Sequence, residues 1–138
     1  LKGLIMGNIA ISLEHLERWD ETIQTYNETI LLAKGSQFTM AECRAWNNLA
    51  LAFERQAQFE KAKHAYEKAL ELAYKSNESE MIGLILANLA ELDKDYDALN
   101  EALLILEKAG YSEQANEFRR RLPELTKTSG ETLDRPKL

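Results

Sequence analysis

The chain has 138 residues, a size that fits one domain. Its hydrophobic content of 45% and its charged content of 29% indicate neither a disordered nor a membrane protein. No segment approaches the roughly 20 apolar residues that a membrane-spanning helix needs. The net charge of −6 argues against nucleic acid as the main partner, because nucleic-acid binding depends on clustered positive charge.

The start of the chain and its cysteine content suggest a setting for the protein. The first residue is Leu1 rather than Met, and no charged-then-apolar secretory pattern follows it, so we expect a domain of a longer protein. Cys43 is the only cysteine, which excludes an intramolecular disulfide and favours a reducing compartment. We therefore expect a cytoplasmic protein. Cys43 also falls on an apolar stripe, which predicts a buried, unreactive thiol.

Helical periodicity extends along most of the chain. Apolar residues recur at steps of three and four, the pattern of amphipathic helices. Gly35 is predicted to end one helix in a left-handed cap, and Thr39 with Glu42 to form a capping box for the next. Ser76 and Asn77 are predicted to open a later helix in the same way. Together these signals predict helices at about 2–16, 19–34, 38–56, 59–75, 78–94, 97–109 and 112–122.

Residues 43–82 carry the clearest pair of helices. Small residues allow two helix backbones to approach closely, while aromatic side chains fill the space around them. The expected stripe of the first helix contains Trp46, Leu49, Ala50 and Phe53. The expected stripe of the second helix contains Phe59, Ala62, Tyr66, Ala69 and Ala73.

The same pattern recurs once before this segment and once after it, in the same register, which indicates a repeat protein. The repeats are expected at about 3–42, 43–82 and 83–110. The earlier copy carries Met6, Ile9, Ala10 and Leu13, then Trp19, Thr22, Tyr26 and Thr29. The later copy carries Leu86, Leu89 and Ala90, then Leu99, Ala102, Leu106 and Ala109.

A different pattern follows Gly110. Ser112 can start a last helix at 112–122, which we expect to be the polar cap of the repeat domain 1–122. Its basic segment 119–121 complements the helix dipole; contact with nucleic acid is the less favoured alternative. Pro123 is expected to end this helix, and the polar composition of 123–138 predicts a disordered tail.

The motif Trp-x2-Leu-Ala-x2-Phe, followed by Ala-x3-Tyr-x2-Ala, resembles the tetratricopeptide repeat, whose usual pattern has Gly at the position of Ala50. The 40-residue period resembles the long-repeat branch of that family, with kinesin light chain, Pins-type adaptors and Rap-type bacterial regulators. The resemblance implies an all-α, right-handed superhelical solenoid of antiparallel helix pairs, with about three repeats and a C-terminal capping helix. It also implies a protein–protein interaction module that binds an extended peptide or a partner helix in its concave groove.

The sequence offers no sign of catalysis, so we expect no enzyme, no cofactor and no metal site. His15 and His64 occupy non-equivalent positions of different repeats, and no Gly-rich phosphate loop follows a strand. Asp93, Asp95 and Asp97 alternate as calcium ligands can, but they lack the turn glycine and the late Glu of an EF-hand loop. A solvated turn is the favoured interpretation.

An asparagine recurs at one position of each repeat, as Asn8, Asn48 and Asn88. In kinesin light chain and in the O-linked GlcNAc transferase superhelix, which the chain resembles here, groove asparagines hold a peptide backbone. An amide suits that task because it offers a donor and an acceptor together. The alternative is that these asparagines cap or brace the repeats themselves.

The resemblance places further side chains in the same groove. The residues chosen as peptide-binding, besides the three asparagines, are Ile11, Arg44, Asn47, Leu51, Arg55 and Glu91. An alternative function is a structural or regulatory segment of a larger signalling or transcription protein. In that case the chain would self-associate through Leu4, Ile5 and Ile9, which crowd one helix face beside a single charge at Lys2.

Overall fold

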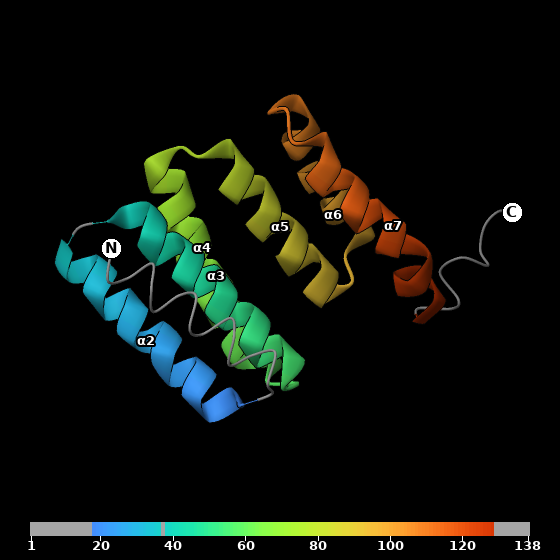
Figure 1. The fold of residues 1–138 in the computed structure, drawn as a ribbon. Helices are drawn as coiled ribbons and strands as arrows, with labels where there is room; N and C mark the ends of the chain where they lie inside the picture. The colour runs from blue at the N-terminus through green and yellow to red at the C-terminus, as the bar shows by residue number, and fades with distance from the viewer. Residues whose placement is uncertain (1–17, 37, 129–138) are drawn as a thin grey trace, which may run out of the picture.

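The computed structural model describes residues 18–36 and 38–128, with side chains described for 18–35 and 38–121. This part of the chain forms helices joined by short turns (Figure 1). They are α2 (Trp19–Ser36), α3 (Thr39–Arg55), α4 (Phe59–Ser76), α5 (Ser79–Asp93), α6 (Tyr96–Lys108) and α7 (Ser112–Thr128). All but the end of α7 lie within two residues of the predicted bounds. The helix expected at 2–16 lies outside the described residues.

Each helix packs mainly against the next one along the chain, in the antiparallel arrangement visible in Figure 1. The closest pairs are α3 with α4 and α5 with α6, which are the expected second and third repeats. The helix α5 also contacts α7. The first helix of the α5–α6 pair therefore touches the helix that follows this pair along the chain. Such stacking, in which each unit contacts only its neighbours, makes the fold an all-α repeat solenoid.

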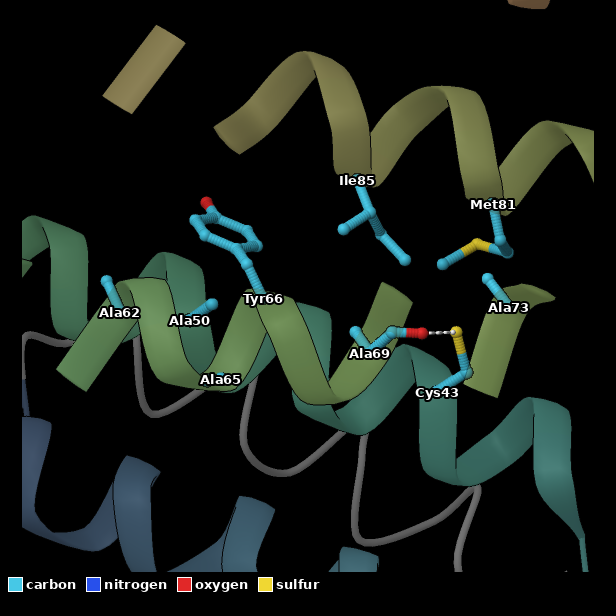
Figure 2. Packing of buried hydrophobic residues seen from close by; sticks show 9 residues of the cluster. All are labelled: Cys43, Ala50, Ala62, Ala65, Tyr66, Ala69, Ala73, Met81 and Ile85. Atoms are coloured by element: carbon cyan, nitrogen blue, oxygen red, sulfur yellow. Dashed lines mark hydrogen bonds between the residues drawn. The ribbon is translucent and has the colours of Figure 1, made fainter. Parts of the chain in front are cut away.

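The core lies between successive helices, and its best-packed part joins α3, α4 and α5 (Figure 2). Tyr66 is fully buried at its centre, and its ring points from α4 towards α5. Ile85 and Met81 point back from α5 into the same space. Ala50 and Ala62 are fully buried as predicted, and their small side chains allow the backbones of α3 and α4 to approach closely.

Some residues of the predicted stripes are less buried than their spacing suggests. Phe59 is 53% exposed, because it begins α4 and its partner helix ends at Arg55. Trp46 and Phe53 are half-buried rather than central to the core. The predicted stripe position Ala109 is exposed at the end of α6.

The predicted helix caps are mostly wrong. Thr39 is already helical at the start of α3, and this end has no side-chain cap; the Glu42 carboxylate accepts a hydrogen bond from Trp46 Nε1 instead, at 3.2 Å. Gly35 lies within the last turn of α2. Asn77 ends α4 in the left-handed conformation, with φ of 55°, and does not begin α5. Asparagine tolerates this conformation because its short polar side chain can bond locally.

The last helix departs from the repeat. The helices α3 and α5 begin at Thr39 and Ser79, so a further repeat of the same length would begin at Arg119, whereas α7 already begins at Ser112. The helix α7 also continues to Thr128, through Pro123, so its expected end at 122 is wrong. The division into a domain at 1–122 and a disordered tail at 123–138 stays a prediction.

Gly83 lies where α5 packs tightly against α6. A Cβ atom at this position would lie 2.7 Å from Leu106 Cγ and 2.8 Å from Leu106 Cδ2. Leu106 is itself fully buried, so it has no open space to move into. The third pair therefore packs through a glycine on α5.

We predict that Gly83→Ala lowers the free energy of unfolding by about 1–2 kcal/mol. Overpacking against Leu106 costs about 1–3 kcal/mol, and the better helix propensity of alanine returns at most about 1 kcal/mol. Gly35→Ala is the matched control, because nothing lies within 4 Å of its Cβ position. Urea unfolding should find this control unchanged or more stable. Equal effects of the two substitutions would contradict the close packing of α5 and α6.

Candidate functional site

The helices α3, α5 and α7 surround a pocket of about 390 Å³, called here the α3–α5–α7 pocket. Glu54 and Arg55 come three and four positions after Leu51, so the three side chains share one face of α3. Four of the predicted peptide-binding residues meet here. The lining residues are Leu51, Glu54, Arg55, Asn88, Glu91 and Arg121.

An ion pair between α5 and α7 forms one wall of the pocket. Arg121 Nη2 donates to Glu91 Oε2 at 3.0 Å. The Glu91 side chain is only 14% exposed, whereas that of Arg121 is 52% exposed and lies over the Phe118 ring, 4.6 Å from its centroid. Burial raises the pKa of the Glu91 carboxyl, and the Arg121 guanidinium offsets part of this rise. Arg121 therefore favours the charged form of Glu91, against the effect of burial.

A second carboxylate is anchored to the core. Tyr66 Oη donates a hydrogen bond to Glu54 Oε1 at 2.8 Å. Burial and the Glu54 charge both raise the pKa of Tyr66, so its hydroxyl stays protonated and remains a donor. The Glu54 charge also raises the pKa of Glu91, which places the two carboxylates within electrostatic reach of each other. The pocket thus combines two carboxylates with the guanidinium groups of Arg55 and Arg121.

Asn88, one of the three asparagines that recur in the repeats, forms a hydrogen bond within the fold. Asn88 Nδ2 donates to Asn47 Oδ1 at 3.2 Å, which links α5 to α3 across the repeat boundary. The pair leaves the Asn47 amide hydrogens and the Asn88 carbonyl oxygen for further hydrogen bonds. Asn48 is half-buried on α3, and Arg44 is exposed on the same helix. The remaining predicted residues, Asn8 and Ile11, lie outside the described residues.

Glu54 and Arg121 are the pocket residues outside the predicted set, and Arg121 is the one that the repeat pattern could not place. Its basic neighbours suggested only an interaction with the helix dipole, or nucleic-acid contact. The helix α7 starts earlier than the 40-residue period requires, so the period does not predict where α7 lies. It therefore could not predict that Arg121 lies beside α3 and α5. The opposite charges of Arg121 and Glu91 were the feature of the sequence that could have suggested this pair.

The three consecutive arginines of α7 each face a carboxylate. Arg119 donates to Glu107 on α6, and this hydrogen bond holds the pKa of Glu107 below its usual value. The next arginine, Arg120, lies 3.1 Å from Glu117 on its own helix, and Arg121 pairs with Glu91. The segment therefore does not form a patch of uncompensated positive charge.

The alternating aspartates lie at the junction of α5 and α6, where Asp93 ends α5, Asp95 precedes α6 and Asp97 lies in its first turn. Asp95 caps α6 by accepting a hydrogen bond from the Ala98 backbone N–H at 3.1 Å. Asp93 lies 3.6 Å from the Lys63 ammonium on α4. Within residues 18–36 and 38–128, no group of three or more His, Cys, Asp or Glu side chains could hold a metal ion. None of the described helices is long and apolar enough to cross a membrane.

A second pocket, of about 380 Å³, lies among α2, α3 and α4. The His64 ring meets Trp46 edge-on at 6.5 Å, and the Lys61 ammonium lies 5.7 Å from the Phe53 ring centroid. The stripe pattern assigned both aromatic rings to the core, so it gave no sign of this pocket. Its lining residues are Asn27, Trp46, Leu49, Phe53, Glu60, Lys61, His64 and Ala65.

Cys43 is fully buried, as its place on the apolar stripe predicts. Its Sγ donates to the Ala69 carbonyl oxygen at 3.2 Å, across the boundary between α3 and α4 (Figure 2). Burial raises the pKa of the Cys43 thiol to about 11. The group is therefore a protonated packing element at neutral pH.

We predict that the Cys43 thiol makes stability depend on pH in the alkaline range. Because the folded-state pKa is raised, the protonated thiol stabilises the fold fully below its ordinary pKa of 9.0, and this contribution is lost as pH rises towards about 11. Urea unfolding between pH 8 and pH 10.5 should show a steeper loss for the wild type than for Cys43→Ala. Parallel pH profiles would contradict the burial of this group, as would fast labelling by iodoacetamide in the folded state.

Comparison with known proteins agrees with the helix pairs. A family model described as tetratricopeptide repeat matches residues 3–75, more than half of the chain. No curated protein matches the chain. Tetratricopeptide repeats are non-catalytic modules that generally mediate interactions between proteins. From its matching repeats and its stacked helix pairs, the chain belongs to the tetratricopeptide repeat family.

Proposed function

We propose that this chain binds an extended peptide, or a helix, of a partner protein on the face formed by α3, α5 and α7. The observation that carries this proposal is the α3–α5–α7 pocket, which gathers apolar, amide and charged side chains from the first helices of two repeats and from α7. Ligand sites commonly combine apolar surface with a few well-placed polar groups. The single thiol at Cys43 fits an adaptor that works in the reducing cytoplasm.

The amides are suited to hold the main chain of such a ligand. Packed helices lie about 8–10 Å apart, close to the length of three extended residues, so amides on neighbouring helices can reach peptide groups about three residues apart. The Asn47–Asn88 hydrogen bond fixes the orientation of two of these amides before a ligand arrives. A site that is ordered in advance loses less entropy on binding. Leu51 can supply apolar contact beside them.

We predict that Asn48→Ala weakens binding of a peptide selected by display by about 1–3 kcal/mol, because peptide groups lose their hydrogen-bond partners. Isothermal titration calorimetry measures this change. Asn88→Ala should lower both affinity and melting temperature, because it also breaks the link from α5 to α3. Asn100→Ala is the control, since Asn100 is exposed on α6. A lower melting temperature for Asn48→Ala at unchanged affinity would show that Asn48 stabilises the repeat and does not bind the peptide.

We also propose that the chain self-associates through the apolar face of Leu4, Ile5 and Ile9. Support comes from the sequence, in which these residues crowd one face of a predicted helix. Ile5→Glu should therefore shift the chain towards monomer in sedimentation equilibrium, because a charge on that face must be desolvated on association. A wild-type chain that is already monomeric, with an equally stable Ile5→Glu variant, would disprove this contact.

A further inference from the structure

The α3–α5–α7 pocket already holds a cationic side chain from its own chain. Arg121 reaches from α7 to Glu91 on α5, with 3.0 Å between Nη2 and Oε2. We propose that this pocket recognises an arginine side chain of the bound peptide, and that Arg121 is an internal substitute which the ligand displaces. The inference rests on the proposed peptide-binding function and adds the chemical identity of the anchoring residue.

The two members of the ion pair differ in how easily they can be separated. Glu91 lies on α5 and its side chain is 14% exposed, so leaving its charged carboxylate without a cation would be costly. Arg121 is 52% exposed at the end of a long side chain, so its guanidinium can return to water at little cost. The Arg121 guanidinium already lies over the Phe118 ring, 4.6 Å from its centroid, and this contact does not require Glu91. An incoming guanidinium can therefore replace Arg121 without leaving Glu91 unpaired.

The rest of the pocket suits an arginine side chain. Glu54 is held in place by the buried hydroxyl of Tyr66 and provides a second carboxylate for a group with several donors. Leu51 lies in the same lining and can contact the aliphatic stem of an arginine. Arg55 also lines the pocket, so we expect the incoming cation to enter at Glu91, where Arg121 now lies. The net charge of −6 favours the approach of a basic peptide.

The test uses two matched probes, the acetylated and amidated pentapeptides Ala-Ala-Arg-Ala-Ala and Ala-Ala-Cit-Ala-Ala, where Cit is citrulline. Citrulline has nearly the shape of arginine but no charge. Titration into the ¹⁵N-labelled chain, followed by NMR, should shift the side-chain amide signals of Asn47 and Asn88. The arginine peptide should bind at least about tenfold more tightly than its citrulline twin, because a charge-assisted hydrogen bond replaces a neutral one.

Variants of α7 test the displacement directly. Arg121→Gln should tighten binding of the arginine peptide by about threefold to tenfold, because the internal competitor is gone. Arg120→Gln changes the net charge equally but leaves the Glu91 pair intact, so it should leave the affinity unchanged. Glu91→Gln should remove the preference for arginine over citrulline, whereas Glu113→Gln, at an exposed position of α7, should keep it.

Three results would overturn the inference. They are equal affinities for the two pentapeptides, equal effects of Arg121→Gln and Arg120→Gln, and no shift of the Asn47 and Asn88 amides by the arginine peptide. Any of these results leaves the proposed function open to its own test, because peptides selected by display can still bind through the asparagines. If selected peptides bind in an asparagine-dependent way but carry no basic residue, only the arginine preference is lost.

Discussion

Close approach between antiparallel helices is the constraint on which the rest of this structure depends. The backbones of α3 and α4 pack through fully buried alanines such as Ala50 and Ala62, and α5 packs on α6 through Gly83. Small residues at these contacts increase the contact between helices and let larger neighbours fill the space around them. The resulting stack holds successive helices at a nearly fixed spacing. A binding face that crosses several helices needs such spacing, since its groups lie on separate elements.

Tyr66 connects this packing to the candidate site. Its ring is fully buried among α3, α4 and α5, while its hydroxyl donates to Glu54 in the α3–α5–α7 pocket. A hydroxyl held by a close-packed ring has little freedom, so it fixes the carboxylate that it contacts. Glu91 is likewise fixed by its half-buried position on α5. The acidic groups of the pocket are thus held by their surroundings, whereas the Arg121 side chain is 52% exposed.

The period of the sequence sufficed for the helices, and the family resemblance added part of the site. Leu51, Arg55, Asn88 and Glu91 were chosen by their positions in the repeat, and the structure brings them to one pocket. Local cap signals were less reliable, because a capping side chain can find a stronger partner elsewhere. Glu42 illustrates this, since its carboxylate accepts from the Trp46 indole instead of completing a capping box at the start of α3.

The sequence by itself determined the all-α class, the helix pairs and the buried state of Cys43, because all three follow from the spacing of apolar residues along one chain. Tertiary structure alone decided which charges meet. The pairing of Arg121 with Glu91 depends on how α7 lies against α5, and this helix begins outside the 40-residue period. The hydrogen bond between Asn88 and Asn47 likewise depends on the distance between two helices. Periodicity fixes which face of a helix is apolar, but packing between helices fixes which side chains on different helices come within bonding distance.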